Sequence, residues 1–346
     1  MARIFRFLVV AASALILLVT GCSLIDEALE ECKESLKLTC HLRLVTNVKV
    51  QLMTQLSDKR DEALREALEK HLDNVFSEYA RDVDLSFYAA DEEGRRLEHR
   101  TAIMEAEQAT YEIELPARDY DLQALANIGT ESHVRLTGDE FCNTAQVSQP
   151  VTDLMPSQTA GLFATRMPLT VHRDESESFD VNLYMFNSAV AMVVHRDSCE
   201  YVSASCELLE LSDGFMVQDS LFTFSKPTRF ASVEVPVDTI GYESNWRTTP
   251  ALFCGVAFPS VDAGTKADGE EETLWQVAVN VELPDETVTR TVISVSTPLP
   301  AGELIVLRGW LHANGVYEPE PVPDVMVCGI SVTLNWEEGM HYNPEL

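Results

Sequence analysis

Apolar and polar residues alternate along most of the chain, and this pattern predicts β-strands. The first alternating run spans residues 42–52, and its apolar members share one parity: Leu42, Leu44, Val48, Val50 and Leu52. A period of two places successive side chains on opposite faces of a strand. The run therefore predicts one long half-buried strand, or two strands in line.

A different spacing follows over residues 58–80, where apolar residues recur three and four positions apart. They are Leu64, Leu68, Leu72, Val75, Phe76 and Tyr79. This spacing places them on one face of a helix, and either Ser57 or Asp58 can cap its N-terminus. Asp61 and Arg65 lie four residues apart, as in an ion pair on the outer face. We predict one early amphipathic helix at about 58–80.

Alternating runs then continue to the end of the chain, with turn-forming residues between them. They cover 83–87, 111–115, 120–126, 179–185, 189–194, 231–235, 275–283, 287–295, 304–310 and 330–336. Prolines and small polar residues gather in 143–160, which is typical of a domain boundary. Short strands joined by turns indicate antiparallel sandwiches. The sequence therefore predicts an all-β fold with two antiparallel β-sandwich domains, one over 36–150 that includes the helix and one over 160–346.

The first residues combine a positively charged start with a short apolar run. Arg3 and Arg6 accompany the 13 residues of Phe7–Val19. A helix of that length reaches about 20 Å, short of the ~30 Å hydrocarbon core, so it suits a signal peptide better than a membrane span. The run ends in Val19-Thr20-Gly21-Cys22, which matches the bacterial lipobox.

The lipobox predicts a lipoprotein signal peptide over 1–21, cleavage between Gly21 and Cys22, and attachment of lipid such as palmitate at the Cys22 thiol. Acidic residues are frequent in 22–35, which we expect to be a tether between lipid and fold. Buried acyl CH₂ groups contribute about 0.8 kcal/mol each, so more than one chain makes a stable anchor. The alternative is an ordinary signal peptide with a cysteine nearby.

The charge of the chain restricts its partners. Its formal net charge is −31, and neutralisation of nucleic-acid phosphates requires a basic surface. We therefore expect no nucleic-acid partner. A highly solvated extracellular surface is the simplest explanation for the charge.

The cysteines do not define a secure disulfide framework. Of the eight, Cys22 is assigned to lipid, and an odd number remains, so at least one thiol is unpaired. Cys199 and Cys206 are close enough in sequence to close a hairpin, and Cys32 and Cys40 could tie the N-terminal segment. Buried single cysteines are the alternative.

The sequence contains no catalytic motif that we can identify: no Gly-x-Ser-x-Gly elbow, no His-Glu-x-x-His and no phosphate-binding glycine loop. His195, Asp197 and Cys199 would share one face of a strand, but a polar strand end is favoured over a metal site. The acidic segment 262–272 is better explained as a solvated loop than as a weak cation site. We predict no catalytic residue, no metal, no cofactor and no enzymatic activity.

The tryptophans offer a possible sugar-binding platform. Trp275, Trp310 and Trp336 share parity with apolar neighbours in predicted strands, however, so packing in a core is favoured for them.

The order of these features resembles a family, the Bacteroidales fimbrial anchor subunits of the FimB/Mfa-type lipoproteins. The resemblance rests on the lipobox at Cys22, the single early helix, and three strand segments. These are DVDLSFY at 82–88 with its DEEG turn, LPARDY at 115–120, and VTLNWEEG at 332–339. It spans nearly the whole chain after the signal peptide.

The resemblance implies two transthyretin-like β-sandwiches and a structural role at the base of a fimbria. Its implied partners are fimbrial stalk subunits, joined by strand addition, and the outer membrane, reached through lipid. The implied location is the outer membrane, exposed at the cell surface. Only ten residues follow Trp336, which is short for a donated strand. A surface glycan- or peptide-binding lipoprotein is the alternative function, and a secreted hydrolase is a more distant one.

Overall fold

The computed structural model describes residues 35–320 except 47, 77–78, 92, 105–108, 130, 132, 173–177, 197–198, 239–248 and 261–272. Several predicted features lie outside these residues: the signal peptide and Cys22, the acidic tether, the acidic segment 262–272, and the strand at 330–336. The described residues form mostly β-structure, in four sheets with two helices near the N-terminus. The predicted all-β sandwich fold is confirmed.

The large sheet has seven strands in the order β3-β2-β5-β8-β9-β1-β4. All its neighbouring pairs are antiparallel except β1 and β9, which are parallel. In chain order its strands are β1 (Ser35–Val45), β2 (Asp82–Ala89), β3 (Arg96–Ile103), β4 (Thr110–Pro116), β5 (Asp119–Ala126), β8 (Phe163–Thr170) and β9 (Ser178–Met185).

The small sheet has four short antiparallel strands in the order β13-β12-β7-β6. They are β6 (Arg135–Thr137), β7 (Gln146–Ser148), β12 (Gly214–Met216) and β13 (Leu221–Thr223), and the short 3₁₀ helix η2 (Cys142–Thr144) precedes β7. The small sheet packs on one face of the large sheet, where a cluster that includes Phe186, Phe215 and Phe258 excludes water.

The remaining two sheets form a second sandwich. The central sheet has the order β15-β16-β10-β19-β20, with β10 and β19 parallel, and the distal sheet has the order β14-β11-β17-β18. Their strands are β10 (Ser188–Arg196), β11 (Ser203–Leu209), β14 (Arg229–Ala231), β15 (Val233–Glu234), β16 (Ala251–Ala257), β17 (Trp275–Glu282), β18 (Val288–Val295), β19 (Leu304–Leu311) and β20 (Tyr317–Pro319).

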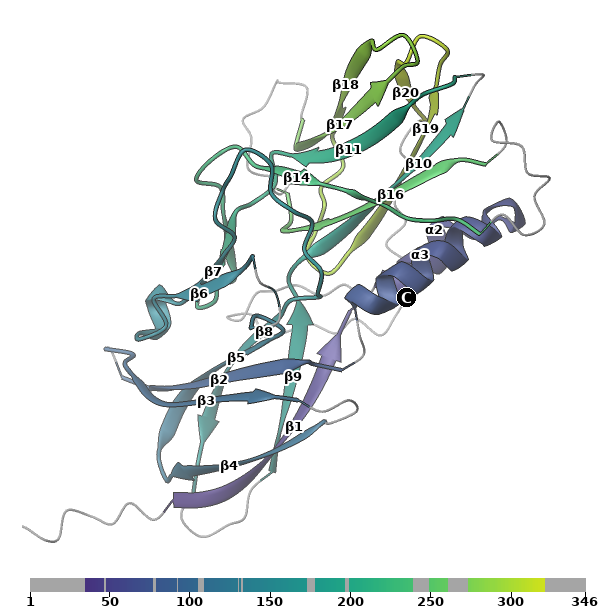
Figure 1. Ribbon diagram of the computed structural model, residues 1–346. Helices are drawn as coiled ribbons and strands as arrows, with labels where there is room; N and C mark the ends of the chain where they lie inside the picture. The colour runs from purple at the N-terminus through teal and green to yellow at the C-terminus, as the bar shows by residue number, and fades with distance from the viewer. Residues whose placement is uncertain are drawn as a thin grey trace, which may run out of the picture.

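The second sandwich encloses its own hydrophobic core and continues the large sheet end to end (Figure 1). Only Phe186 and Asn187 separate β9 of the large sheet from β10 of the central sheet. The large sheet itself extends beyond the predicted boundary at 143–160, because β8 and β9 follow that segment and still pair within it. The division into two folding domains stays a prediction.

The predicted amphipathic helix is present as α3 (Glu62–Val75), preceded by the 3₁₀ turn η1 (Lys59–Asp61). Asp58 caps η1, since its carboxylate accepts a hydrogen bond from Arg60 N at 3.0 Å. The predicted apolar face is buried from Leu64 to Phe76, but Tyr79 is 39% exposed and lies beyond the helix. The predicted Asp61–Arg65 pair is wrong, because Asp61 pairs with Arg308 instead.

The strand predicted over 42–52 is only half correct. β1 ends at Val45, and Val48–Gln55 forms the helix α2. β1 pairs with β9 in a register that places Val45 opposite Tyr184. Continuation in this register would place Val50 opposite Ala189, but Leu304 of β19 already pairs with Ala189. β19 therefore occupies the space that a longer β1 would need, and tertiary packing overrides the strand pattern.

Other predicted segments agree more closely with the structure. Asp91 and Gly94 form a turn, in which Gly94 N donates to Asp91 O at 3.1 Å. Gly94 has φ +55°, and a Cβ there would collide with Cys142 Sγ, so glycine is required. The run predicted at 231–235 forms two short edge strands rather than one, β14 and β15, in different sheets.

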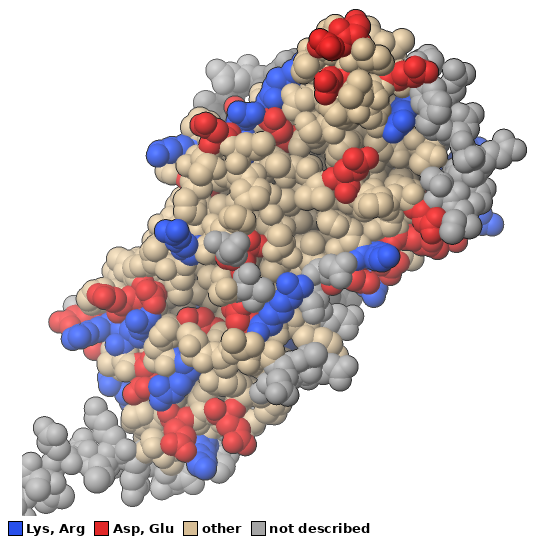
Figure 2. Space-filling model, viewed as in Figure 1, with Lys and Arg blue, Asp and Glu red and all other residues tan. Residues whose placement is uncertain are grey.

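The faces in view carry acidic and basic side chains interspersed, with a broad uncharged area over β14 and β16 (Figure 2). An ionic cluster of the described residues lies on the outer face of the distal sheet. There Glu207 accepts hydrogen bonds from Arg229 and Arg290 at 3.0–3.2 Å, and from Asn280 at 3.1 Å. Burial alone would raise the pKa of the Glu207 carboxyl. The hydrogen bonds from Arg290 and Arg229 lower it by more, so this pKa lies below its usual value.

We expect Glu207→Gln to lower the free energy of unfolding at pH 7 by about 1–3 kcal/mol, the usual contribution of hydrogen bonds to a charged group. Because the folded pKa of Glu207 lies below its unfolded value, its stabilisation is complete above the unfolded pKa of about 4.3 and is lost as the pH falls through the folded pKa. Urea denaturation of both proteins from pH 7 to pH 3 measures this difference. A difference that stays constant over the whole range would contradict the assignment.

Candidate functional site

The first described strand, β1, is the segment that follows the predicted lipid tether, and it lies inside the large sheet. It pairs with β4 on one side over seven residue pairs and with β9 on the other side over seven. Its inward side chains Leu38, Cys40 and Leu42 are between 0% and 9% exposed. β1 thus lies between β4 and β9: β4 pairs with its first part, Ser35–His41, β9 pairs with its later part, Thr39–Val45, and the two ladders overlap at residues 39–41.

The Cys40 thiol is part of this packing. It lies in the core beneath the large sheet, and burial raises its pKa to about 12, with a smaller effect from Asp180. A thiol with such a pKa stays protonated and unreactive at neutral pH.

From β1 the chain passes directly into α2, and two glutamines of α2 bond to the main chain of β19. Gln55 Nε2 donates to Leu304 O at 2.6 Å, and Val306 N donates to Gln55 Oε1 at 2.8 Å. Leu304 N donates to Gln51 Oε1 at 2.5 Å. β20 pairs with β19 only from Gly309 to Leu311, so the glutamine amides satisfy edge groups that β20 does not reach.

A partly buried ion pair joins the following turn, η1, to the same strand. Arg308 of β19 donates two hydrogen bonds to the Asp61 carboxylate, at 2.6 and 3.1 Å. Together with the glutamines, this pair joins the N-terminal segment to the second sandwich as well as to the large sheet. The sequence did not predict roles for Gln51, Gln55 and Arg308, because Gln51 lies in a run that has the period of a strand and Gln55 follows just after it.

We expect Gln55→Ala to lower the free energy of unfolding by about 1–3 kcal/mol, since two buried main-chain groups of β19 lose their partner. Hydrogen exchange at the Val306 amide should become faster. Thr54→Ala is the matched control, because among the described residues the exposed Thr54 hydroxyl bonds only to Val50 O of its own helix. Equal effects of both substitutions would show that Gln55 does not fasten α2 to β19.

Cys199 and Cys206, the pair that could close a hairpin, are both buried free thiols, which agrees with the alternative of buried single cysteines. Both face the core of the second sandwich, where they pack as small apolar side chains. Burial raises the pKa of each of them. Cys40, Cys142 and Cys254 are also buried and free.

The other predicted candidates do not converge on a site. His195 stacks on Trp310, with ring centroids 4.8 Å apart, and the described residues contain no group of three metal-ligating side chains. Trp275 is fully buried, as predicted. The prediction for Trp310 is wrong, since it is 43% exposed and its indole donates to Glu320 at 2.9 Å. It lies at the end of β19 near the rim of the sheet, beyond the packed interior.

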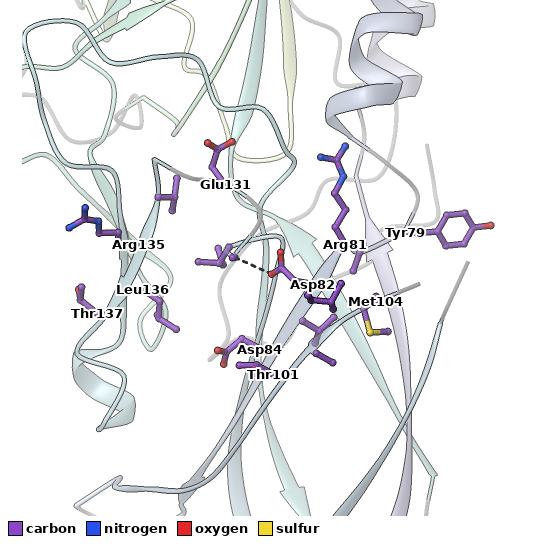
Figure 3. A pocket seen from close by; sticks show the side chains of 17 residues that line it. Tyr79, Arg81, Asp82, Asp84, Thr101, Met104, Glu131, Arg135, Leu136 and Thr137 are labelled. Carbon is purple, nitrogen blue, oxygen red and sulfur yellow. Dashed lines mark hydrogen bonds between the residues drawn. The ribbon is translucent and has the colours of Figure 1, made fainter. Parts of the chain in front are cut away.

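A groove of about 1130 Å³ opens on the large sheet, beside the small sheet (Figure 3). One side is formed by the start of β2 and the end of β3, and the other by β6. Asp82, Asp84 and Thr101 point into it from the large sheet, across from Leu136 and Thr137. No helix among the described residues is long and apolar enough to cross a membrane.

Comparison with known proteins identifies the fold. No family profile matches the chain, and no curated protein matches it. Among solved structures, a candidate polysaccharide-binding protein from Bacteroides thetaiotaomicron matches with a TM-score of 0.52 and 10% identity, over 82% of this chain and 94% of that one. A candidate adhesin from Bacteroides ovatus matches with a TM-score of 0.51 and 10% identity, over 82% and 92%.

The fimbrial anchor protein Mfa2 from Porphyromonas gingivalis matches at a lower TM-score of 0.47, with 10% identity over 82% of this chain and 95% of that one. The sequence identities of these matches are low, so the comparisons show a similarity of fold alone. The chain shares its β-fold with these two proteins from Bacteroides, over 94% and 92% of their length.

Proposed function

We propose that the protein is a non-enzymatic lipoprotein that attaches a fimbrial polymer to the outer membrane and ends it at its base. The observation that carries this proposal is the position of β1. The strand that follows the predicted lipid anchor is an internal strand of the large sheet, with seven residue pairs on each side. The segment that would carry the lipid therefore continues directly into a strand that pairs with β4 and β9.

An internal β1 also explains how such a subunit ends a polymer. Strand addition requires a sheet position whose main-chain groups are unpaired. A subunit whose own N-terminal strand fills the position between β9 and β4 does not accept a further strand there. The lipid at Cys22 would keep that strand in place, because the 13 residues from 22 to 34 reach at most about 45 Å.

The sequence motifs that resemble fimbrial anchor subunits support the same role, and the fold likeness to candidate adhesins is consistent with a place at the cell surface. A stalk subunit is the expected partner, with strand addition as the expected mode of contact. Binding of a glycan or peptide at the cell surface is the second candidate, and the groove beside β6 favours it.

Deletion of the gene tests the anchor role. We expect cells without the protein to release fimbriae into the medium, and the fimbriae to be longer because nothing ends the polymer at its base. Electron microscopy of cells and an immunoblot of the culture supernatant measure both effects, with plasmid-borne wild-type gene as the control. If cell-bound fimbriae keep their number, length and retention, the anchor role is wrong and the binding role becomes the leading one.

A further inference from the structure

Three side chains lie in a row across the outer face of the central sheet. Trp310 of β19 is in register with His195 of β10 on one side and with Glu318 of β20 on the other, so all three point to the same side. The next residues along the chain, Leu311 and Tyr317, point the opposite way, into the core of the second sandwich. The row therefore lies on the outside of that sandwich, at the end of β10 and β19.

The helical segment covers this face of the central sheet only in part. Along β19 the same face carries Val306, which packs in the hydrophobic cluster that contains the buried side of α3. Arg308 comes next and pairs with Asp61, at the start of that helix. Trp310 follows, and 43% of its surface is exposed. Cover by the helical segment thus ends at Arg308, and the next side chain on this face is an exposed indole.

Two contacts hold the Trp310 indole in one orientation. His195 stacks on one of its faces, with ring centroids 4.8 Å apart and ring planes inclined by 28°. The indole N–H donates to Glu320 at 2.9 Å. Burial lowers the pKa of His195, so this imidazole is uncharged at neutral pH and packs as a second aromatic ring. Because one face and the N–H edge are occupied, the exposed surface of the indole comes from its other face and its outer edge.

The rim of this indole surface offers hydrogen-bond acceptors. His312 holds the Glu318 carboxylate, with Nε2 2.7 Å from Oε2, while Glu318 Oε1 has no hydrogen bond within the described part of the chain. The Glu318 side chain is 72% exposed. A ligand for this surface therefore needs a flat apolar face for the indole and hydrogen-bond donors at its edge for the carboxylate. A pyranose ring has both, since C–H groups line its face and hydroxyls surround it.

A cation is the competing ligand, because carboxylates stand beside the ring. Quaternary ammonium groups are usually held in cages of several aromatic side chains. His195 and Trp310 are stacked on each other, so they present one flat surface rather than a cage. The geometry favours a flat ring over a compact cation.

We propose that Trp310 is the platform for a neutral sugar ring of a glycan, with the C–H face of the sugar on the indole and a hydroxyl that donates to the Glu318 carboxylate. The proposal gives the second candidate role, glycan binding, a site and a ligand class. The site lies on the second sandwich, and β1 takes no part in it. Glycan binding at Trp310 can therefore fail while the anchor role holds, and the reverse.

Titration with four soluble hexasaccharides tests the proposal: cellohexaose, maltohexaose, mannohexaose and chitohexaose. The protein is the chain from residue 23 onward, which lacks only the predicted signal peptide and the lipid cysteine. We expect saturable binding of at least one hexasaccharide at millimolar concentration. Isothermal titration calorimetry measures the affinity, and saturation transfer from the protein to the C–H protons of the sugar reports the stacked face. If none of the four binds, the proposal is wrong.

Substitutions at Trp310 separate stacking from other apolar contact. Trp310→Leu keeps an apolar side chain but removes the ring face, so it should weaken binding at least tenfold. Trp310→Phe keeps a ring face and should lose less than Trp310→Leu. Glu318→Ala should weaken binding severalfold, since a hydroxyl of the sugar loses its acceptor. Phe224→Ala is the matched control: Phe224 is also 43% exposed but follows β13, and its loss should change binding less than twofold.

Thermal unfolding and near-ultraviolet circular dichroism establish that each variant is folded. Equal losses in Trp310→Leu and Trp310→Phe would exclude stacking on a ring and overturn the proposal. Equal losses in Trp310→Leu and Phe224→Ala would show unspecific contact and overturn it as well. Binding of choline that Trp310→Leu abolishes, when no hexasaccharide binds, would identify a cation site in place of the sugar site.

Discussion

Replacement of Cys22 by alanine is expected to transfer the protein from the membrane fraction to the soluble fraction. The substitution removes the thiol to which the predicted acyl chains attach, and each buried CH₂ of such chains contributes about 0.8 kcal/mol of membrane affinity. Loss of two or more chains therefore removes essentially all binding. Fractionation of cells with an immunoblot, together with labelling by radioactive palmitate, measures the effect.

Cys32→Ala is the matched control, because it removes a neighbouring cysteine outside the lipobox. It should keep both the label and the membrane location. The lipoprotein assignment fails if Cys22→Ala remains with the outer membrane and the wild-type protein takes up no label.

Leu68→Ala is expected to lower the free energy of unfolding by about 2–5 kcal/mol, which is a large part of the stability of an ordinary domain. Leu68 is 0% exposed and lies in a hydrophobic cluster that includes residues of both the large sheet and the central sheet. The shortened side chain leaves a cavity that the surrounding packed side chains fill only in part. Chemical denaturation followed by circular dichroism measures the loss.

Leu154→Ala removes the same atoms from a loop position that is 46% exposed, and it should cost less than about 0.5 kcal/mol. A loss below that value at Leu68 as well would mean that α3 contributes little to the fold.

The elements that the sequence predicted well are those whose pattern is local. The stripe from Leu64 to Phe76 and the alternating residues of β2 and β5 needed only their own spacing to be recognised. Their burial then followed, because one face of each element is apolar throughout. The turn at Asp91–Gly94 was equally local, since its glycine has no room for a side chain.

The wrong predictions share a different cause: a distant segment takes the position or the partner that the local pattern had assigned. The run 42–52 has the period of a strand, but its second half belongs to the helix Val48–Gln55, because β19, some 250 residues later, occupies the neighbouring position. Asp61 pairs with Arg308 rather than with Arg65, again because β19 lies beside it. No local pattern contains this information. The groove could not be predicted from the sequence for the same reason, since β2, β3 and β6 come together only in the folded protein.

The direction of β1 has a mechanical consequence. The chain enters at Ser35, at the end of the molecule remote from the second sandwich, and runs toward it (Figure 1). In the proposed lipid-anchored subunit, a pull between the membrane and the second sandwich acts along the axis of β1 and loads the ladders to β4 and β9 in shear. The hydrogen bonds of each ladder must then break together rather than one by one as in peeling. Forced unfolding depends on the unfolding rate, and shear keeps that rate low. A flow of fluid over the cell would thus be resisted by two hydrogen-bond ladders at once.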